Sequence, residues 1–193
     1  VFAKMDKNVA EPYFTAVFGS LTYYSNPVVT LGGSRTFLSG GKLVDEPISW
    51  KDAAMQPFQP ILKEQLYNEE TGENPSDQTD QTLSFFVSML FPESRLKVFL
   101  EYGWNDHRWD WYDLRAHPDH SGASIFGLRK YGLFGKPQLF LGFEYANLMK
   151  SPYYPHRATP DWYGRKLFDY SVYDGRRYAA HSGSDSDDMI LFM

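Results

Sequence analysis

Three segments of the chain alternate between apolar and other side chains with a period of two, which constrains the fold more than any other feature of the sequence. Successive side chains of a β-strand point to opposite faces, so this period predicts strands that each carry one apolar face. The clearest segment is 82–91, and segments 96–104 and 138–147 repeat the pattern. The residues expected on the apolar faces are Leu83, Phe85, Val87, Leu96, Val98, Leu100, Leu139, Leu141 and Phe143.

Turn residues separate these strands and indicate hairpins. Residues 92–94 read Pro-Glu-Ser, and 131–137 contains two glycines and a proline, a composition that favours tight turns. Weaker alternation predicts further strands at 13–23, 28–37 and 123–131. The only helix-like stretch, 49–66, begins with Ser49 and Asp52 at a capping spacing and is broken by prolines, so we expect a short loop helix.

Long polar segments alternate with the short turns. They cover 65–81, 105–121 and 149–166, and several loops of this length are unusual in a soluble domain. Outer-membrane barrels have short turns at one end and long loops at the other, with polar residues such as Lys97, Glu101 and Glu144 facing the lumen. The sequence therefore predicts an all-β fold, an antiparallel transmembrane β-barrel with 1–193 as a single domain or a fragment of one. The alternative is a β-sandwich with a thick aromatic core.

Composition excludes some classes of protein. No stretch approaches the ~18 consecutive apolar residues of a membrane-spanning helix, whereas strands of a barrel are compatible with the mean hydropathy of −0.47. A net charge of −5 makes nucleic acid a poor partner, and the absence of cysteine excludes disulfides and thiolate metal sites. Aromatic residues make up 18% of the chain, an excess that favours a surface role.

The densest group of chemically active residues lies in 101–110, at the end of a predicted strand. Protein sites for sugars combine planar polar side chains with aromatic faces, since the former bind hydroxyls and the latter stack on the C–H face of the ring. Trp109 is expected to stack on a sugar ring, and the other candidate residues are expected to form hydrogen bonds with the sugar. Alternatively, the same residues order the loop. The candidate polysaccharide-binding residues are Glu101, Asn105, Asp106, His107, Trp109, Asp110 and His120.

Other chemistries fit the sequence less well. The carboxyl groups in this stretch and Asp113 could serve a glycosidase, but acidic loops commonly have this composition, so we expect a binding protein and no enzyme. His107, His117, His120 and Asp119 follow no recognised metal motif, and we expect neither metal nor cofactor. The aspartates at 185, 187 and 188 lack the pattern of a calcium loop and are expected to form a solvated loop.

Residues 99–107, FLEYGWNDH, end a predicted strand with the order E-Y-G-x-N-D-H. This block resembles a strand of the outer-membrane capsule assembly proteins of the Wzi type. Further similar blocks are Trp109, Asp110, Asp113 and Leu114, then 118–121, 127–130, 144–151 and 161–163, and earlier Phe18-Gly19, Leu31-Gly32 and 34–36. Together the blocks span about 18–186, although the family's chains are much longer.

The resemblance implies a monomeric barrel in the outer membrane of a Gram-negative bacterium, in contact with outer-membrane lipid. It also implies a lectin-like role in attaching or organising capsular polysaccharide at the cell surface, without catalysis. We expect this chain to be a fragment or a truncated homologue. The alternatives from other classes are a soluble carbohydrate-active enzyme or binding module, and a diffusion porin.

Overall fold

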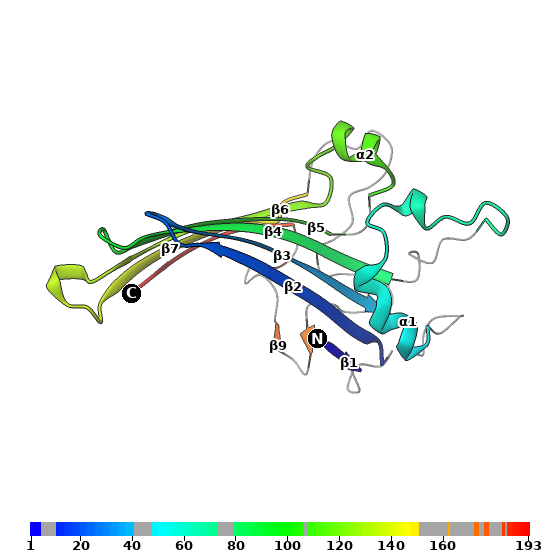
Figure 1. Cartoon of the computed structure of the whole chain (residues 1–193), viewed down its shortest axis with the longest axis horizontal. Helices are drawn as coiled ribbons and strands as arrows, with labels where there is room; N and C mark the ends of the chain where they lie inside the picture. The colour runs from blue at the N-terminus through cyan, green and yellow to red at the C-terminus, as the bar shows by residue number, and fades with distance from the viewer. Residues whose placement is uncertain are drawn as a thin grey trace.

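A computed structural model of the chain shows an antiparallel sheet of eight strands in the order β1-β2-β3-β4-β5-β6-β7-β10 (Figure 1). The structure describes residues 1–4, 11–40, 48–72, 79–105, 108–150, 162, 172–173, 176–177, 183 and 185–193. The strands of the sheet are β1 (Phe2–Lys4), β2 (Tyr13–Tyr23), β3 (Val28–Ser39), β4 (Thr79–Phe91), β5 (Leu96–Asn105), β6 (Gly122–Tyr131), β7 (Phe140–Asn147) and β10 (Asp187–Phe192).

The remaining elements are short. A separate two-stranded sheet pairs β8 (Val172–Tyr173) with β9 (Arg176–Arg177). The helical elements are α1 (Trp50–Met55), η1 (Gln56–Phe58), η2 (Lys63–Gln65), α2 (Trp111–Ala116) and η4 (Leu133–Gly135). Within the described residues, no helix has both the length and the apolar character needed to cross a bilayer.

All six strands predicted from alternation are present, and the all-β antiparallel meander is confirmed. β2 has the predicted bounds, β4 and β3 extend beyond theirs, and β7 begins two residues later. The expectation of a solvated loop at Asp187 and Asp188 is wrong, because both residues begin β10 and pair with Asn147 and Ala146 of β7. Two adjacent aspartates have low strand propensity, but the register with β7 places them in the sheet. β1 was also not predicted.

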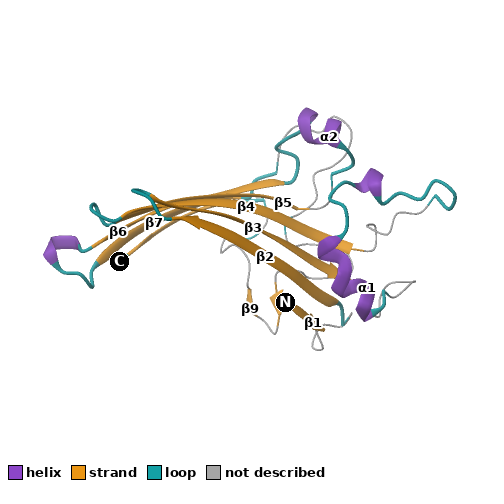
Figure 2. Ribbon diagram, in the orientation of Figure 1, coloured by secondary structure: helices purple, strands orange, loops and turns teal. Residues whose placement is uncertain are grey.

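Short turns and long connections lie at opposite ends of the sheet, as predicted (Figure 2). Turns at 24–27, 92–95 and 132–139 form one end, which we call the turn end. The connections 40–78, 106–121 and 148–186 lead away from the other end, which we call the loop end. The described segments 48–72 and 108–121 therefore lie at the same end of the sheet (Figure 2).

The sheet is open. β1 and β10 are its two edge strands, and no pairing between them occurs in the part of the chain that the structure describes. Figure 1 shows that the sheet is strongly bowed along its strands. The described strands therefore form a curved antiparallel wall that is not closed into a barrel.

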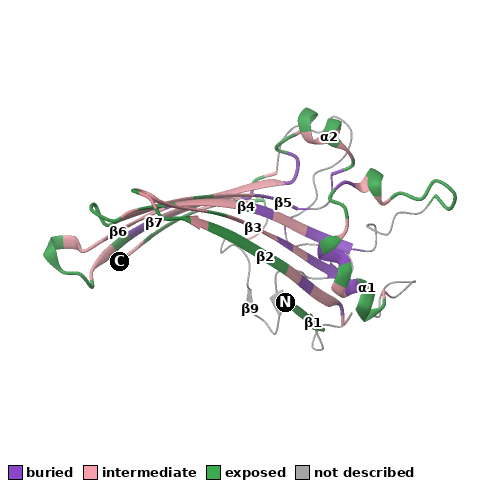
Figure 3. Ribbon diagram, in the orientation of Figure 1, coloured by how far each residue is buried: buried purple, intermediate pink, exposed green. Residues whose placement is uncertain are grey.

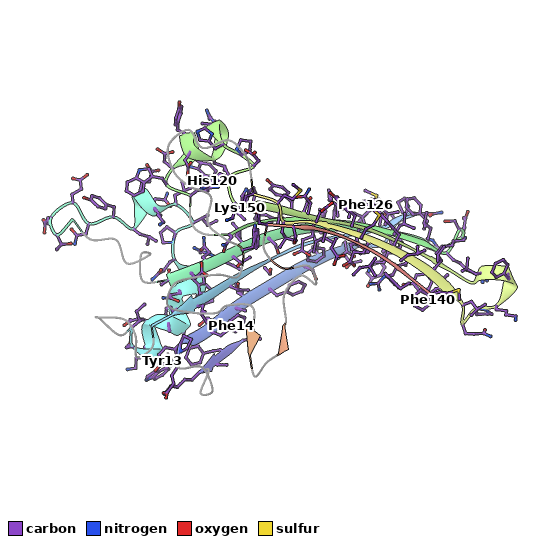
Figure 4. All side chains as sticks on the ribbon, turned by 180° about the vertical axis from the view of Figure 1, so that it is seen from behind. Tyr13, Phe14, His120, Phe126, Phe140 and Lys150 are labelled. Atoms are coloured by element: carbon purple, nitrogen blue, oxygen red, sulfur yellow. The ribbon has the colours of Figure 1, made fainter. Side chains whose placement is uncertain are left out.

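One face of the wall, the apolar face, is hydrophobic along its middle from β2 to β10, and its charged residues Arg35, Lys130 and Asp187 lie near the strand ends. Cross-strand partners on this face form continuous rows, such as Leu21, Leu31, Val87, Leu100, Phe126 and Tyr145. Many of these side chains are open to the surroundings: Leu21 is 75% exposed and Leu191 is 72% exposed. Figure 4 labels Phe126 on the outer side of the bow.

The opposite face, the mixed face, pairs aromatic rings with glycines of neighbouring strands. A Cβ added to Gly32, Gly127 or Gly142 would lie 2.4, 2.2 or 2.3 Å from a ring atom of Phe86, Phe99 or Phe192, respectively. Each ring therefore lies across a residue that has no side chain. This arrangement fills the space above glycine in a curved sheet and helps to fix the register of the strands.

Replacing Gly127 by Ala should lower the free energy of unfolding by about 1–3 kcal/mol, the usual cost of overpacking. The added Cβ meets the Phe99 ring, and the ring must leave its position over the strand. Gly19→Ala is the matched control, since a Cβ at Gly19 meets nothing within 4 Å. Denaturant unfolding of both variants and of Gly127→Ala/Phe99→Leu tests the contact. Equal stability of both single variants, or failure of the second substitution to restore stability, would contradict it.

Candidate functional site

Buried residues concentrate where the strands meet the loop end (Figure 3). Phe37, Leu38 and Ala53 are fully buried there, and Leu62 is nearly so. A smaller cluster on the mixed face joins Ala146, Leu148 and Trp162 to the partly buried Ala123 and Ile125. Among the residues that the structure describes, buried side chains are therefore concentrated at the loop end.

The segment that contains α1 and η1 packs over the end of the apolar face. Ser49 caps α1 as predicted, since its Oγ accepts a hydrogen bond from Asp52 N at 3.2 Å. Thr15 Oγ1 on β2 donates to the carbonyl of Ala53 at 2.9 Å. These contacts fix the short helix that the sequence predicted at 49–66 onto β2.

Arg35 of β3 is the main anchor of this segment. The buried guanidinium donates to Gln81 Oε1 at 2.7 Å and to the carbonyls of Pro57 at 3.2 Å and Pro60 at 2.9 Å, and also to the carbonyl of Gln59. Its centre lies 4.7 Å from the centroid of the Phe37 ring. One side chain thus satisfies carbonyl groups of a proline-rich turn that has few backbone donors of its own.

The loop 108–121 contacts the segment 48–72 through backbone hydrogen bonds. Lys63 N donates to the carbonyl of Arg108 at 2.8 Å, and Glu64 N donates to the carbonyl of Trp109 at 3.0 Å. The Tyr67 and Trp109 rings lie 6.0 Å apart at 55°. The two loops therefore form one surface, which we call the loop platform (48–72 and 108–121).

The carbonyl of Pro118 joins the loop platform to the strands. It accepts hydrogen bonds from Tyr102 Oη at 3.0 Å, Trp104 Nε1 at 3.1 Å and an Arg108 Nη at 3.2 Å. The same nitrogen of Arg108 donates to the carbonyl of His120. Tyr102 and Trp104 belong to β5, so their hydrogen bonds tie the loop to the end of that strand.

Asp110 and Asp113 cap α2. Asp110 Oδ1 accepts from Asp113 N at 2.7 Å, and Asp113 Oδ2 accepts in turn from Trp109 N at 3.1 Å. This arrangement resembles a capping box, except that Asp113 accepts from the N–H of Trp109 and not from that of the N-cap residue Asp110. Asp110 therefore orders the loop, which is one of the two roles expected for it from the sequence.

The structure separates the other predicted site residues. Glu101 lies on the mixed face of β5 between Phe86 and Ile125 and away from the loop. Asn105 ends β5 and is buried, with its backbone N bonded to the carbonyl of Ser121 at 3.0 Å. His120 is buried beside Arg108, and Figure 4 places it at the loop end. Asp106 and His107 lie outside the described residues.

Sequence reasoning missed most of the aromatic side chains that the loop platform exposes. Trp111 is 63% exposed and Tyr112 is 73% exposed at the start of α2, while Trp109 and Tyr67 are also exposed. Figure 1 shows α2 standing out from the sheet. The Trp-x-Trp-Tyr order of 109–112 was a usable signal, because such exposed rings exceed what packing of a six-residue helix requires.

The loop platform combines aromatic and acidic side chains. Aromatic faces are exposed beside carboxylates that are held by backbone hydrogen bonds, and among the described residues no group of three or more His, Asp or Glu is arranged to hold a metal ion. Comparisons with protein-family models, with curated proteins and with solved structures found no match.

Proposed function

We propose that this sheet is part of the wall of an outer-membrane β-barrel and that its loop platform binds capsular or other surface polysaccharide without catalysis. The observation that carries the proposal is the exposed apolar face. Monomeric soluble proteins rarely expose contiguous apolar patches of more than a few hundred Å². Here the exposed residues run across the sheet and include Leu21, Leu31, Phe85, Leu100, Phe126, Leu141, Met189 and Leu191.

The dimensions of the apolar face suit a bilayer. From Leu96 to Trp104, β5 advances about 26 Å at ~3.3 Å per residue, or about 20 Å across the bilayer at a tilt of ~40°. The apolar band of outer-membrane barrels is ~25 Å tall and is flanked by aromatic girdles. Tyr23 and Tyr24 lie at the turn end, and Tyr102 and Trp104 at the loop end, so aromatic residues occur at both boundaries.

The opposite face suits a wet lumen. Lys97, Glu101, Arg129 and Glu144 all lie on the mixed face, where charged side chains retain water. Placing four charges in hydrocarbon would be costly, whereas a lumen tolerates them. The distribution of charge therefore supports lipid on one side of the wall and water on the other.

The loop platform is the natural place for the saccharide. Trp111 and Tyr112 offer exposed ring faces for stacking, and Trp109 lies next to them on a loop that Arg108 and Asp110 hold in place. Rigid aromatic groups bind at a low entropic cost. We also propose that the protein is a monomer in the outer membrane, as its resemblance to capsule assembly proteins implies.

Affinity electrophoresis of the detergent-extracted protein against surface polysaccharide tests the binding function. We expect Trp111→Ala/Tyr112→Ala to weaken retention at least tenfold, since stacking of one ring is worth ~0.5–1.5 kcal/mol beyond the area it buries. Phe134→Ala is the matched control, because Phe134 is an exposed ring at the turn end. Unchanged retention of the double variant would contradict the saccharide assignment.

A diffusion porin is the second candidate, and the charged mixed face is the observation that favours it. Conductance in planar bilayers separates the two functions. A steady ohmic current without retention by polysaccharide would indicate a porin, and retention without current would indicate a binding barrel. Recovery of the protein in the aqueous phase without detergent would rule out both the porin and the binding barrel. It would favour a soluble carbohydrate-binding module or enzyme.

A further inference from the structure

Two cations face each other on the mixed face without an anionic partner. Lys97 of β5 and Arg129 of β6 are direct cross-strand partners and therefore project from the same side of the sheet. Within the described residues, neither Lys97 nor Arg129 forms an ion pair. Like charges directly opposite each other destabilise a sheet, so the pairing of Lys97 with Arg129 itself costs stability.

The two cations share one aromatic neighbour, Phe99. Lys97 Nζ lies 5.9 Å and the Arg129 guanidinium carbon 5.8 Å from the centroid of the Phe99 ring. The Arg129 carbon also lies 5.4 Å from the centroid of Phe192. The rings hold the guanidinium close to the sheet and shield part of it from water, because cation–π contacts operate at this separation.

Arg129 has unused hydrogen-bonding capacity. Its Nε is buried and has no hydrogen-bond partner among the described residues. Arginine presents a planar fork of donors that fits the two oxygens of a carboxylate or phosphate. The nearest acidic groups on this face are Glu144, which lies opposite Gly127, and Glu101, and neither forms an ion pair with Arg129.

We propose that Lys97 and Arg129 form a binding site for the anionic group of an acidic saccharide, namely a uronate carboxylate or a sugar phosphate. The anion relieves the repulsion between the two cations and satisfies the fork of Arg129. Phe140 and Phe192, which lie 6.0 Å apart beside Arg129, supply apolar contact for the sugar ring. The choice of a saccharide rests on the proposed function, whereas the choice of an anion rests on the mixed face alone.

Isothermal titration of the full chain in detergent micelles tests the site with three probes: glucuronate, glucose and inorganic phosphate. We expect glucuronate to bind at least tenfold more tightly than glucose, and binding to weaken as NaCl is raised. R129Q should weaken glucuronate binding at least fivefold, and K97Q/R129Q should abolish it. K136Q is the matched control, since it removes one exposed positive charge from the same end and should leave affinity within twofold.

R129Q should change the thermal midpoint of the free protein little, because it removes the repulsion from Lys97 together with the cation–π contacts to Phe99 and Phe192. If R129Q does unfold the protein, R129K serves as the second variant, and it should keep part of the affinity because the charge remains without the fork.

Equal binding of glucose and glucuronate, or equal losses in K136Q and R129Q, would overturn the anion site. Binding of phosphate without binding of glucuronate would overturn the saccharide assignment. Trp111→Ala/Tyr112→Ala should leave glucuronate binding unchanged. Failure of the loop platform to bind polysaccharide is therefore distinguishable from failure of this site.

Discussion

Arginine in place of Leu100 should lower the free energy of unfolding from lipid vesicles by about 2–4 kcal/mol, the cost of a charge at the midplane of a barrel wall. Leu100 is the central residue of the apolar face on β5. It is 46% exposed, and in a water-exposed sheet such a substitution changes stability by only about 0.5 kcal/mol or less. The size of the effect therefore distinguishes lipid from water at this face.

Tyr24→Arg is the matched control for Leu100→Arg. Tyr24 is more exposed than Leu100 and lies in a turn beyond the strand ends, where the cost of an arginine falls to about 0–1 kcal/mol. Urea titration of the vesicle-inserted protein measures both variants. Equal and small effects would remove the transmembrane proposal, and insertion failing for Leu100→Arg alone would support it.

Replacing Arg35 by Met should lower the free energy of unfolding by about 3 kcal/mol or more, because each buried carbonyl left without a donor costs ~1–3 kcal/mol. The carbonyls of Pro57, Gln59 and Pro60 and the amide oxygen of Gln81 all accept from Arg35. Methionine fills a similar volume but donates nothing. We also expect the segment 48–72 to detach and become sensitive to limited proteolysis.

Two further variants test the role of Arg35. The free energy of unfolding of Arg35→Lys should lie between those of Arg35→Met and the wild type, since lysine keeps the charge and loses the planar fork. Arg115→Met is the matched control, because Arg115 is exposed in the last turn of α2. Proteolysis of 48–72 at the wild-type rate in Arg35→Met would show that other contacts hold the segment.

The sequence identified the strands because their pattern is local. A period of two depends only on the geometry of one strand, so 82–91 and 96–104 could be assigned to faces before any partner strand was known. The same reasoning failed for β10, where Asp187 and Asp188 precede an apolar stretch and pairing with β7 decides the conformation. β1 was missed because three residues are too few to show a period.

The candidate site was less predictable than the strands. Residues 101–110 are adjacent in sequence, but strand pleating places Glu101 on the mixed face, and Asn105 and His120 are buried. Asp110 caps a helix. The exposed rings of Trp111 and Tyr112 lie just beyond the predicted group, since burial depends on what a loop packs against and cannot be read from composition.

By itself, the sequence determined the all-β antiparallel class, the two faces of the three clearest strands and the division into a turn end and a loop end. These features follow from periodicity and turn chemistry, which act over a few residues. Only the tertiary structure decided that Arg35 anchors 48–72, that Pro118 joins the second loop to β5, and that Lys97 meets Arg129. Such contacts join residues distant in the chain, and the pairing of the strands brings them together.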